Sequence, residues 1–221
     1  MSQDLRRAAE AAPKGAAAPA TGARAAETAA RRHRILEAAM TLAGEGGYDA
    51  VQMRDVAARS GVALGTLYRH YASKDQLLLA ALADQAGALS ARLALRPPAG
   101  ADPAERVADV LRRASRALGR EPKLTAAMVT ALSSREPDAA AMKEEVNEIL
   151  RTIIAGAIDG TDVPELDGVL RVLGYVWFAV LAAWVSEMLD TTQMGTELAS
   201  AAQLLLERDD SSQQRVSAAE A

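Results

Sequence analysis

The chain has 221 residues, of which half are apolar and 24% are charged, and its formal net charge is −4. This composition is typical of a globular protein with a sizeable core. Because the chain has no cysteine and two histidines, His33 and His70, it excludes disulfides, thiolate zinc sites and multi-histidine metal centres. We expect no metal and no cofactor.

Long stretches of the chain have the periodicity of amphipathic helices. Between two tails, apolar residues recur at i, i+4 and i+7, and no segment alternates convincingly at period two. Residues 1–27 are mostly Ala, Pro, Gly and Arg, so they lack the large side chains that offset chain entropy, and we expect a disordered tail. Residues 209–221 are expected to form a second loose tail. The pattern predicts an all-α protein of about nine helices, at residues 28–45, 53–60, 64–70, 74–95, 103–119, 122–133, 137–158, 164–189 and 193–208.

Two predicted helix starts carry specific capping signals. Asp102 precedes a proline at the first helical position and stands three residues before Glu105, which is typical of an N-cap acceptor and its reciprocal acid. Ser73 and Gln76 form a second predicted capping box. These signals predict helices that begin at residues 103 and 74.

Residues 28–70 differ from the rest of the chain because a long helix is followed by two short helices. A turn that contains Gly61 joins the short helices, and this arrangement is typical of a helix-turn-helix, whose second helix enters the DNA major groove. Residues 31–74 carry seven Lys and Arg against four acidic residues, although the whole chain is acidic. A surface that binds DNA would therefore be confined to this segment.

The second short helix and its surroundings offer groups that suit phosphate oxygens. Lys74 stands at a helix start that itself favours an anion. The alternative is a plain three-helix core without a DNA role, and Tyr71 is expected to pack in the core in either case. Arg31, Arg32 and Arg34 would either neutralise phosphates or form a solvated basic helix start. The predicted DNA contacts are Gln52, Arg54, Leu64, Gly65, Thr66, Tyr68, Arg69, His70 and Lys74.

Residues 47–57, 61–71 and 73–77 closely resemble the DNA-binding domain of TetR-family transcriptional repressors. The glycine turn, the G-T-L-Y sequence and the S-K-x-x-L sequence stand at the spacings of that family. The resemblance implies a homodimeric repressor that binds a palindromic operator on double-stranded DNA and is released by a small effector. Two positions depart from the family, which usually has Ser or Thr where Gln52 and Ala63 stand. Gln52 can still donate to a phosphate, whereas Ala63 cannot.

Aromatic residues gather in the predicted helix 164–189, which is apolar on all faces from residue 172 to 185 and is expected to be buried on all sides. Either a cavity for an apolar ligand or the equivalent helix of a second subunit would cover it. The resemblance implies both, because in the family the last two long helices form the dimer interface and the middle helices enclose a ligand. Ordinary core packing is the alternative at every candidate position. The candidate effector contacts are Met128, Leu132, Met142, Trp177, Phe178 and Trp184.

The C-terminal body also resembles the KstR-type branch of the family, actinobacterial regulators of sterol and lipid catabolism, in residues 120–128 and 177–184. That resemblance implies a lipophilic effector such as a coenzyme A thioester of a steroid acid. An exposed basic face is the alternative to a phosphate-binding pocket mouth made of Arg113, Arg116, Arg120 and Lys123. The predicted domains are a tail (1–27), a helix-turn-helix domain (28–74), a helical effector-binding and dimerisation domain (75–208) and a second tail (209–221).

Other function classes fit the sequence less well. An all-helical enzyme or lipid carrier is disfavoured because both histidines lie in the helix-turn-helix block and the apolar helix has no acid at its centre. A transcriptional activator, or a DNA-binding protein without an effector, stays open. The longest uncharged run in the C-terminal half, residues 172–186, is shorter than the roughly 20 residues that span a bilayer. Because the polar start does not resemble a signal peptide, we expect a cytoplasmic protein without membrane contact.

Overall fold

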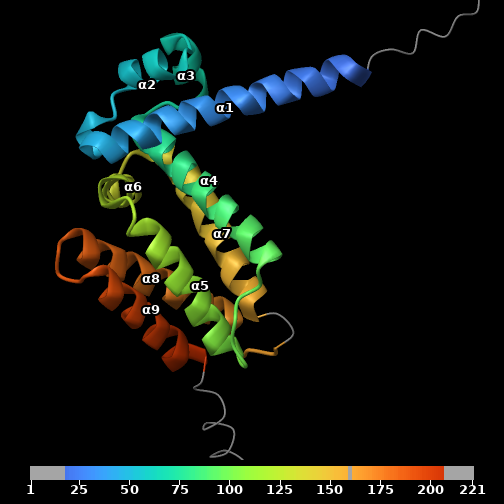
Figure 1. Ribbon diagram of the computed structural model, residues 1–221, viewed down its shortest axis with the longest axis vertical. Helices are drawn as coiled ribbons and strands as arrows, with labels where there is room; N and C mark the ends of the chain where they lie inside the picture. Colours follow the sequence, from blue (N-terminus) through green and yellow to red (C-terminus); the bar gives the residue numbers. More distant parts are fainter. Residues whose placement is uncertain (1–17, 159–160, 207–221) are drawn as a thin grey trace, which may run out of the picture.

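The computed structural model describes residues 18–158 and 161–206, and within these residues it is all-α, with no strand (Figure 1). The predicted fold class is confirmed. Two short 3₁₀ helices, η1 (Tyr48–Ala50) and η2 (Pro137–Ala139), accompany the α-helices. The α-helices are α1 (Ala18–Gly46), α2 (Met53–Ser60), α3 (Leu64–His70), α4 (Lys74–Leu95), α5 (Pro103–Leu118), α6 (Pro122–Ser133), α7 (Ala140–Ile158), α8 (Leu166–Val185) and α9 (Thr191–Leu206).

Helix α1 begins ten residues earlier than the sequence predicted. Residues 18–27 are helical, so the expectation of a disordered tail over 1–27 is wrong for this part, while residues 1–17 and the predicted tail 209–221 lie outside the described residues. Alanine has the highest helix propensity, and Arg31 pairs with Glu27 one turn away at 2.8 Å, which favours the helix further. A helix that continues outward from a packed one does not need large apolar residues of its own.

The other boundaries follow local capping chemistry. The Asp102 carboxylate accepts the Glu105 N–H at 2.8 Å, and the Ser73 hydroxyl accepts the Gln76 N–H at 3.2 Å, so both predicted caps are confirmed. Helix α8 ends four residues before its predicted end because the chain turns at Glu187, which has a left-handed conformation with φ 59°. The predicted helix 137–158 begins as η2 and continues as α7.

Among the described residues, the core consists of two clusters that share α4 and α6. The first cluster joins α1, α2, α3, the start of α4 and most of the buried face of α6, including Met128. The second joins α5, α7, α8 and α9 with the end of α4, and Val129 of α6 belongs to it. Helix α6 therefore connects the helix-turn-helix block to the body of the molecule.

Two of the described helices, α4 and α8, are long and apolar enough to cross a bilayer by length and composition alone. Helix α4 packs against α1, α6 and α7, which explains its apolar character as that of a core helix. Helix α8 buries few of its side chains, and Val172, Tyr175 and Phe178 are exposed. The expectation that α8 is buried on all sides is wrong for the single chain, because one of its faces packs on no other described element.

Arg113 on α5 fixes the segment that follows α4. Its guanidinium pairs with Asp109 at 2.6 Å and donates to the carbonyls of Arg96 and Pro97 at 2.8 and 3.2 Å. Asp109 also accepts the backbone N–H of Ala99 at 3.0 Å. Although burial raises the pKa of Asp109, the Ala99 N–H and the Arg113 guanidinium outweigh it and hold this pKa below its ordinary value.

We expect Asp109→Asn to lower the free energy of unfolding by about 1 kcal/mol at neutral pH, because a partly buried, charge-assisted contact is lost. The folded-state pKa of Asp109 is lowered, so its contribution is present above the ordinary pKa of 3.8 and is lost as pH falls through the folded value. Thermal unfolding of both proteins from about pH 7 to about pH 2 measures this. The difference in stability between the two proteins should shrink in the acid range. A stability difference that stays constant with pH would contradict this role of Asp109.

Candidate nucleic-acid interface

The turn between α2 and α3 sets the direction of α3. Gly61 has φ 68° and ψ 27°, a left-handed conformation that glycine adopts without strain. The backbone N–H of Val62 then reaches the Ala57 carbonyl at 3.0 Å. Leu67 is fully buried and Tyr71 nearly so, which confirms that Tyr71 packs in the core. Helix α3 is thereby held with one face inward and the opposite face toward solvent.

All nine predicted DNA contacts are at least partly accessible. Leu64, Thr66 and Lys74 are partly buried, and the other six are exposed. Leu64 also packs against the first core cluster. Most of them stand on α2 and α3, which in Figure 1 lie at one end of the molecule, away from α8 and α9. Their placement is compatible with a common binding face, while their contacts with DNA stay a prediction.

Four of the nine residues line one open hollow of about 520 Å³: Gln52, Arg54, Tyr68 and Lys74. The hollow lies where α2 and α4 begin, so two helix N-termini are close together. The first N–H groups of a helix have no intrahelical acceptor, and the helix dipole favours an anion there. Within the described chain, the start of α2 receives no side-chain cap, since Gln52 donates to the Asp49 carbonyl instead, at 2.8 Å. This arrangement suits a phosphate.

Lys74 is held in place by a residue that the sequence analysis missed. Its ammonium group lies 3.7 Å from the centre of the Tyr48 ring and 3.4 Å from the Tyr48 carbonyl oxygen. The Tyr48 hydroxyl donates to the carboxylate of Asp75, which is itself buried. Burial and Asp75 together raise the pKa of Tyr48. The neutral Tyr48 ring offers the lysine a cation–π contact.

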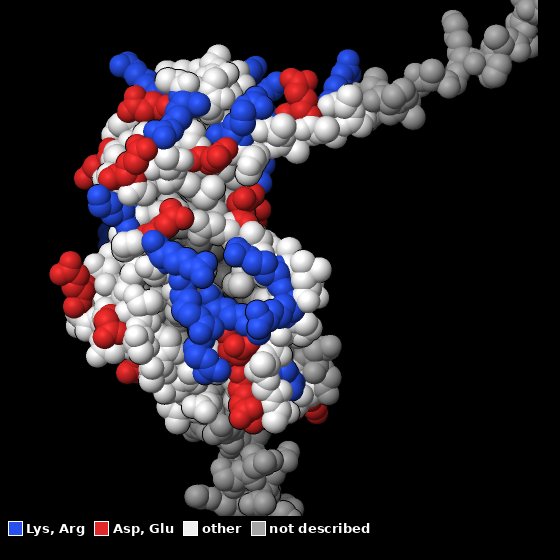
Figure 2. Space-filling view, in the orientation of Figure 1, with Lys and Arg blue, Asp and Glu red and all other residues white. Residues whose placement is uncertain are grey.

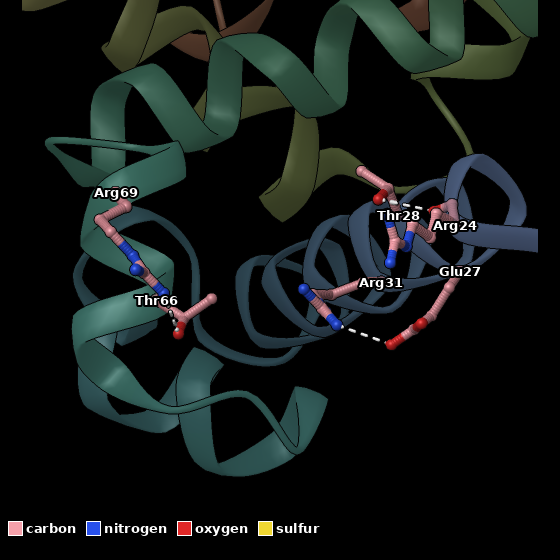
Figure 3. A network of polar contacts seen from close by, with 6 residues as sticks. All are labelled: Arg24, Glu27, Thr28, Arg31, Thr66 and Arg69. Atoms are coloured by element: carbon pink, nitrogen blue, oxygen red, sulfur yellow. Dashed lines mark hydrogen bonds and ion pairs between the residues drawn. The ribbon is translucent and has the colours of Figure 1, made fainter. Parts of the chain in front are cut away.

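The polar side chains of α3 and α1 face solvent at this end of the molecule. The Arg69 guanidinium donates to the Thr66 hydroxyl at 2.9 Å, which orients both groups on α3 (Figure 3). On α1, Arg31 pairs with Glu27, and the Thr28 hydroxyl donates to the Arg24 carbonyl at 2.9 Å. Both helices thus carry arginines whose guanidinium or backbone groups are engaged within their own helix.

The six candidate effector contacts do not all share one core cluster. Met128 is buried in the first core cluster, and Leu132 and Met142 pack against that same cluster. Trp177 and Trp184 pack against the second cluster instead, and Phe178 is exposed.

Of the six candidates, Trp184 lines a second open hollow, of about 500 Å³. Pro122 and Ala126 of α6 form one wall of this hollow, and the segment between α8 and α9 forms the other. The hollow lies against α6, the helix that also packs in the helix-turn-helix block.

Basic side chains gather on the body of the molecule. Figure 2 shows a broad area of Lys and Arg over the face that carries α5 and the end of α4. Of the four predicted phosphate contacts, Arg116 and Arg120 are exposed. Lys123 is also exposed but donates to the Glu45 carbonyl at 3.0 Å, and Arg113 is engaged with Asp109 and the α4–α5 segment. The structure therefore leaves Arg116 and Arg120 as the better candidates.

Two family descriptions match this chain. "Bacterial regulatory proteins, tetR family" matches residues 35–81, and "Tetracyclin repressor-like, C-terminal domain" matches residues 100–205. The HTH-type transcriptional repressor KstR of Rhodococcus jostii is 40% identical over 177 residues, which cover 80% of this chain and 82% of that protein. These matches include both the helix-turn-helix block and the body.

Solved structures are similar over most of the chain as well. The crystal structure of a TetR transcriptional regulator from Rhodococcus sp. RHA1 has 33% identity and a TM-score of 0.76, and the match covers 83% of this chain and 99% of that one. Thermus thermophilus FadR, a repressor crystallised in complex with lauroyl-CoA, has 26% identity and a TM-score of 0.59 over 80% of this chain and 93% of that one. The helical arrangement of the described residues is therefore shared with a TetR transcriptional regulator and a TetR-family transcriptional repressor.

Proposed function

Because the chain belongs to the TetR family of bacterial regulatory proteins, we propose that it represses transcription as a homodimer on a palindromic operator and is released by a lipophilic acyl-CoA thioester. The observation that carries DNA binding is the hollow in which the starts of α2 and α4 meet Tyr68 and Lys74. It combines two helix N-termini, a lysine and a phenol, which are the groups that bind phosphate without reading sequence.

Helix α3 would read the operator sequence. Its outward residues Thr66, Arg69 and His70 carry hydrogen-bonding groups of the kind that reach base edges in the major groove. In the free chain Arg69 is held by Thr66, so its guanidinium is already extended along the outer face of α3. With α3 in one major groove, the second copy in the dimer would place its own α3 one helical turn away.

The effector would bind in the body. Trp184 offers a flat apolar wall to the second hollow, and Pro122 of α6 forms part of the opposite side. Arg120 precedes Pro122 by two residues and is exposed, so phosphate groups of a thioester could meet cations at the edge of this hollow. The complex of the Thermus relative with lauroyl-CoA supports this ligand class; a steroid and a fatty acyl group would both suit the apolar wall.

Helix α6 would couple the two ligands. It lines the second hollow with Pro122 and Ala126, and Lys123 between them donates to the carbonyl of Glu45 near the end of α1. A ligand that favours one position of α6 therefore shifts the position of α1 and, through the first core cluster, of α3. If that position misplaces the two α3 helices for DNA, the effector and the operator each weaken the binding of the other by the same factor.

Tryptophan fluorescence tests the effector site directly, because the chain has two tryptophans. In Trp177→Phe the remaining tryptophan is Trp184, and titration with lauroyl-CoA should change its emission and reduce operator affinity about tenfold, a coupling of ordinary size. The matched variant Trp184→Phe, which keeps Trp177, should show little emission change.

Titrations with free coenzyme A and with lauric acid show which half of the thioester produces the response. A response from Trp177 alone would place the effector elsewhere, and no response of emission, melting temperature or operator affinity would favour an effector-independent DNA-binding protein.

A further inference from the structure

Residues 22–30 of α1 project from the molecule without burying a side chain. Every residue from 22 to 30 is exposed, and α1 first contributes to the core at Ile35. In Figure 1 this segment reaches away from the bundle at the end where α2 and α3 lie. An alanine-rich helix end without tertiary contacts is only marginally stable in water. Because this helix end lies on the side of the candidate DNA face, binding to DNA would give it a partner.

The charge of this segment is that of a DNA-binding surface. We define the α1 arm as residues 22–34, which carry four arginines against one acid, Glu27, in a chain whose net charge is −4. Arg32 is paired with Asp84 of α4 at 3.1 Å. Arg24 and Arg31 are seven residues apart, about two helical turns, so they lie on one side of the arm. Figure 3 shows both on α1, with Glu27 beside Arg31.

The direction of the α1 arm fits the outer flank of an operator. In Figure 1 the arm points to the opposite side from α8 and α9, the last two long helices, through which the resemblance to the family implies dimerisation. A partner on α8 and α9 would therefore leave both arms pointing outward from the twofold axis. An arm of 13 residues is about 20 Å long, which corresponds to about six base pairs at 3.4 Å each.

We propose that the α1 arm binds the DNA backbone outside each half-site, with Arg24 and Arg31 neutralising phosphates. The inference rests on the proposed DNA-binding function and adds a second contact surface to it. Because phosphates are the same in every sequence, this contact depends on the length of the flanking DNA and not on its sequence. Glu27 limits its strength, since it pairs with Arg31 and repels phosphate.

Duplexes of two lengths test the α1 arm. One ends at the outer edges of the two half-sites, and the other extends about ten base pairs further on each side, beyond the reach given by the helix rise. The wild type should bind the long duplex about tenfold more tightly. Arg24→Ala/Arg31→Ala should lose this gain and reduce the salt dependence on the long duplex by roughly 0.9 per lost phosphate contact. Alanine preserves the helix, and Arg92→Ala, at an exposed position near the far end of α4, is the control.

Glu27→Gln separates DNA binding from helix stability. It should increase the gain on the long duplex by about threefold and leave the short duplex unchanged, because a repulsive charge is removed and Arg31 is released. If the arm only needed the Arg31–Glu27 pair to stay helical, the same variant would weaken binding. Equal affinity for both lengths would overturn the arm contact and leave the proposed function standing. No binding of wild type to either duplex would overturn both.

Discussion

The double variant Lys74→Ala/Tyr68→Ala should bind an operator and an unrelated duplex about 100-fold or more weakly, and by the same factor. Both side chains line the hollow at the starts of α2 and α4, and a dimer would lose each of them twice. A hydrogen bond to a charged group contributes about 1.5 to 3 kcal/mol, so four lost contacts can account for this effect even when much of it is compensated by water. Fluorescence anisotropy at several salt concentrations measures it.

The salt dependence identifies the contact. Loss of Lys74 from both subunits should reduce the slope of log affinity against log salt by about 2, since each neutralised phosphate contributes about 0.9. Tyr68→Phe removes a hydroxyl and should weaken binding without changing the slope. Arg92→Ala also removes one positive charge, but far from this face, and should change neither the affinity nor the slope. Unchanged binding by the double variant would exclude the hollow as a DNA interface.

Local chemistry explains which parts of the fold are predictable from the sequence. Helices α2, α3, α4 and α6 begin and end at the predicted residues, because Gly61, Ser73 and Pro122 act on their immediate neighbours. The start of α1 has no such signal, since an alanine-rich segment extends a helix without any cap or apolar face. The end of α8 depends on Glu187 in a left-handed conformation, and glutamate gives no indication of that in a sequence.

The residues of the candidate DNA interface also differ in whether local sequence predicts them. The residues of α3 are predictable because one short motif carries them. The support of Lys74 by Tyr48 crosses 26 positions and depends on how η1 packs, which no local pattern encodes. The candidate effector contacts divide between two core clusters for a related reason: apolar periodicity shows that Met128 and Trp177 face inward, but not that they enter different clusters.

Helix α8 carries the prediction with the largest effect on assembly. Its exposed face presents Val172, Tyr175 and Phe178 to solvent in the single chain, and Gly174 and Ala179, both exposed, would let a second helix approach closely. A mostly apolar face of this kind is typical of an interface between subunits. It also explains why α8 resembles a membrane span by composition. We therefore expect α8, with α9 beside it, to pack against its own copy.

Tyr175→Glu/Phe178→Glu should convert the dimer to a monomer of 23.2 kDa, because packing the two copies together would bury two carboxylates on each side of the interface. Operator affinity should fall about 100-fold or more, since the second α3 would no longer be held at high effective concentration over its half-site. Analytical ultracentrifugation and operator titration measure the two effects. The two side chains are exposed in the single chain, so its thermal unfolding reports whether the subunit itself still folds.

Leu95→Glu is the matched control, because Leu95 is also a large apolar residue and 88% exposed, but it stands at the end of α4 and should leave the dimer intact. If the double variant stays dimeric while Leu95→Glu dissociates, the copies meet through the end of α4 instead, and α8 needs another partner.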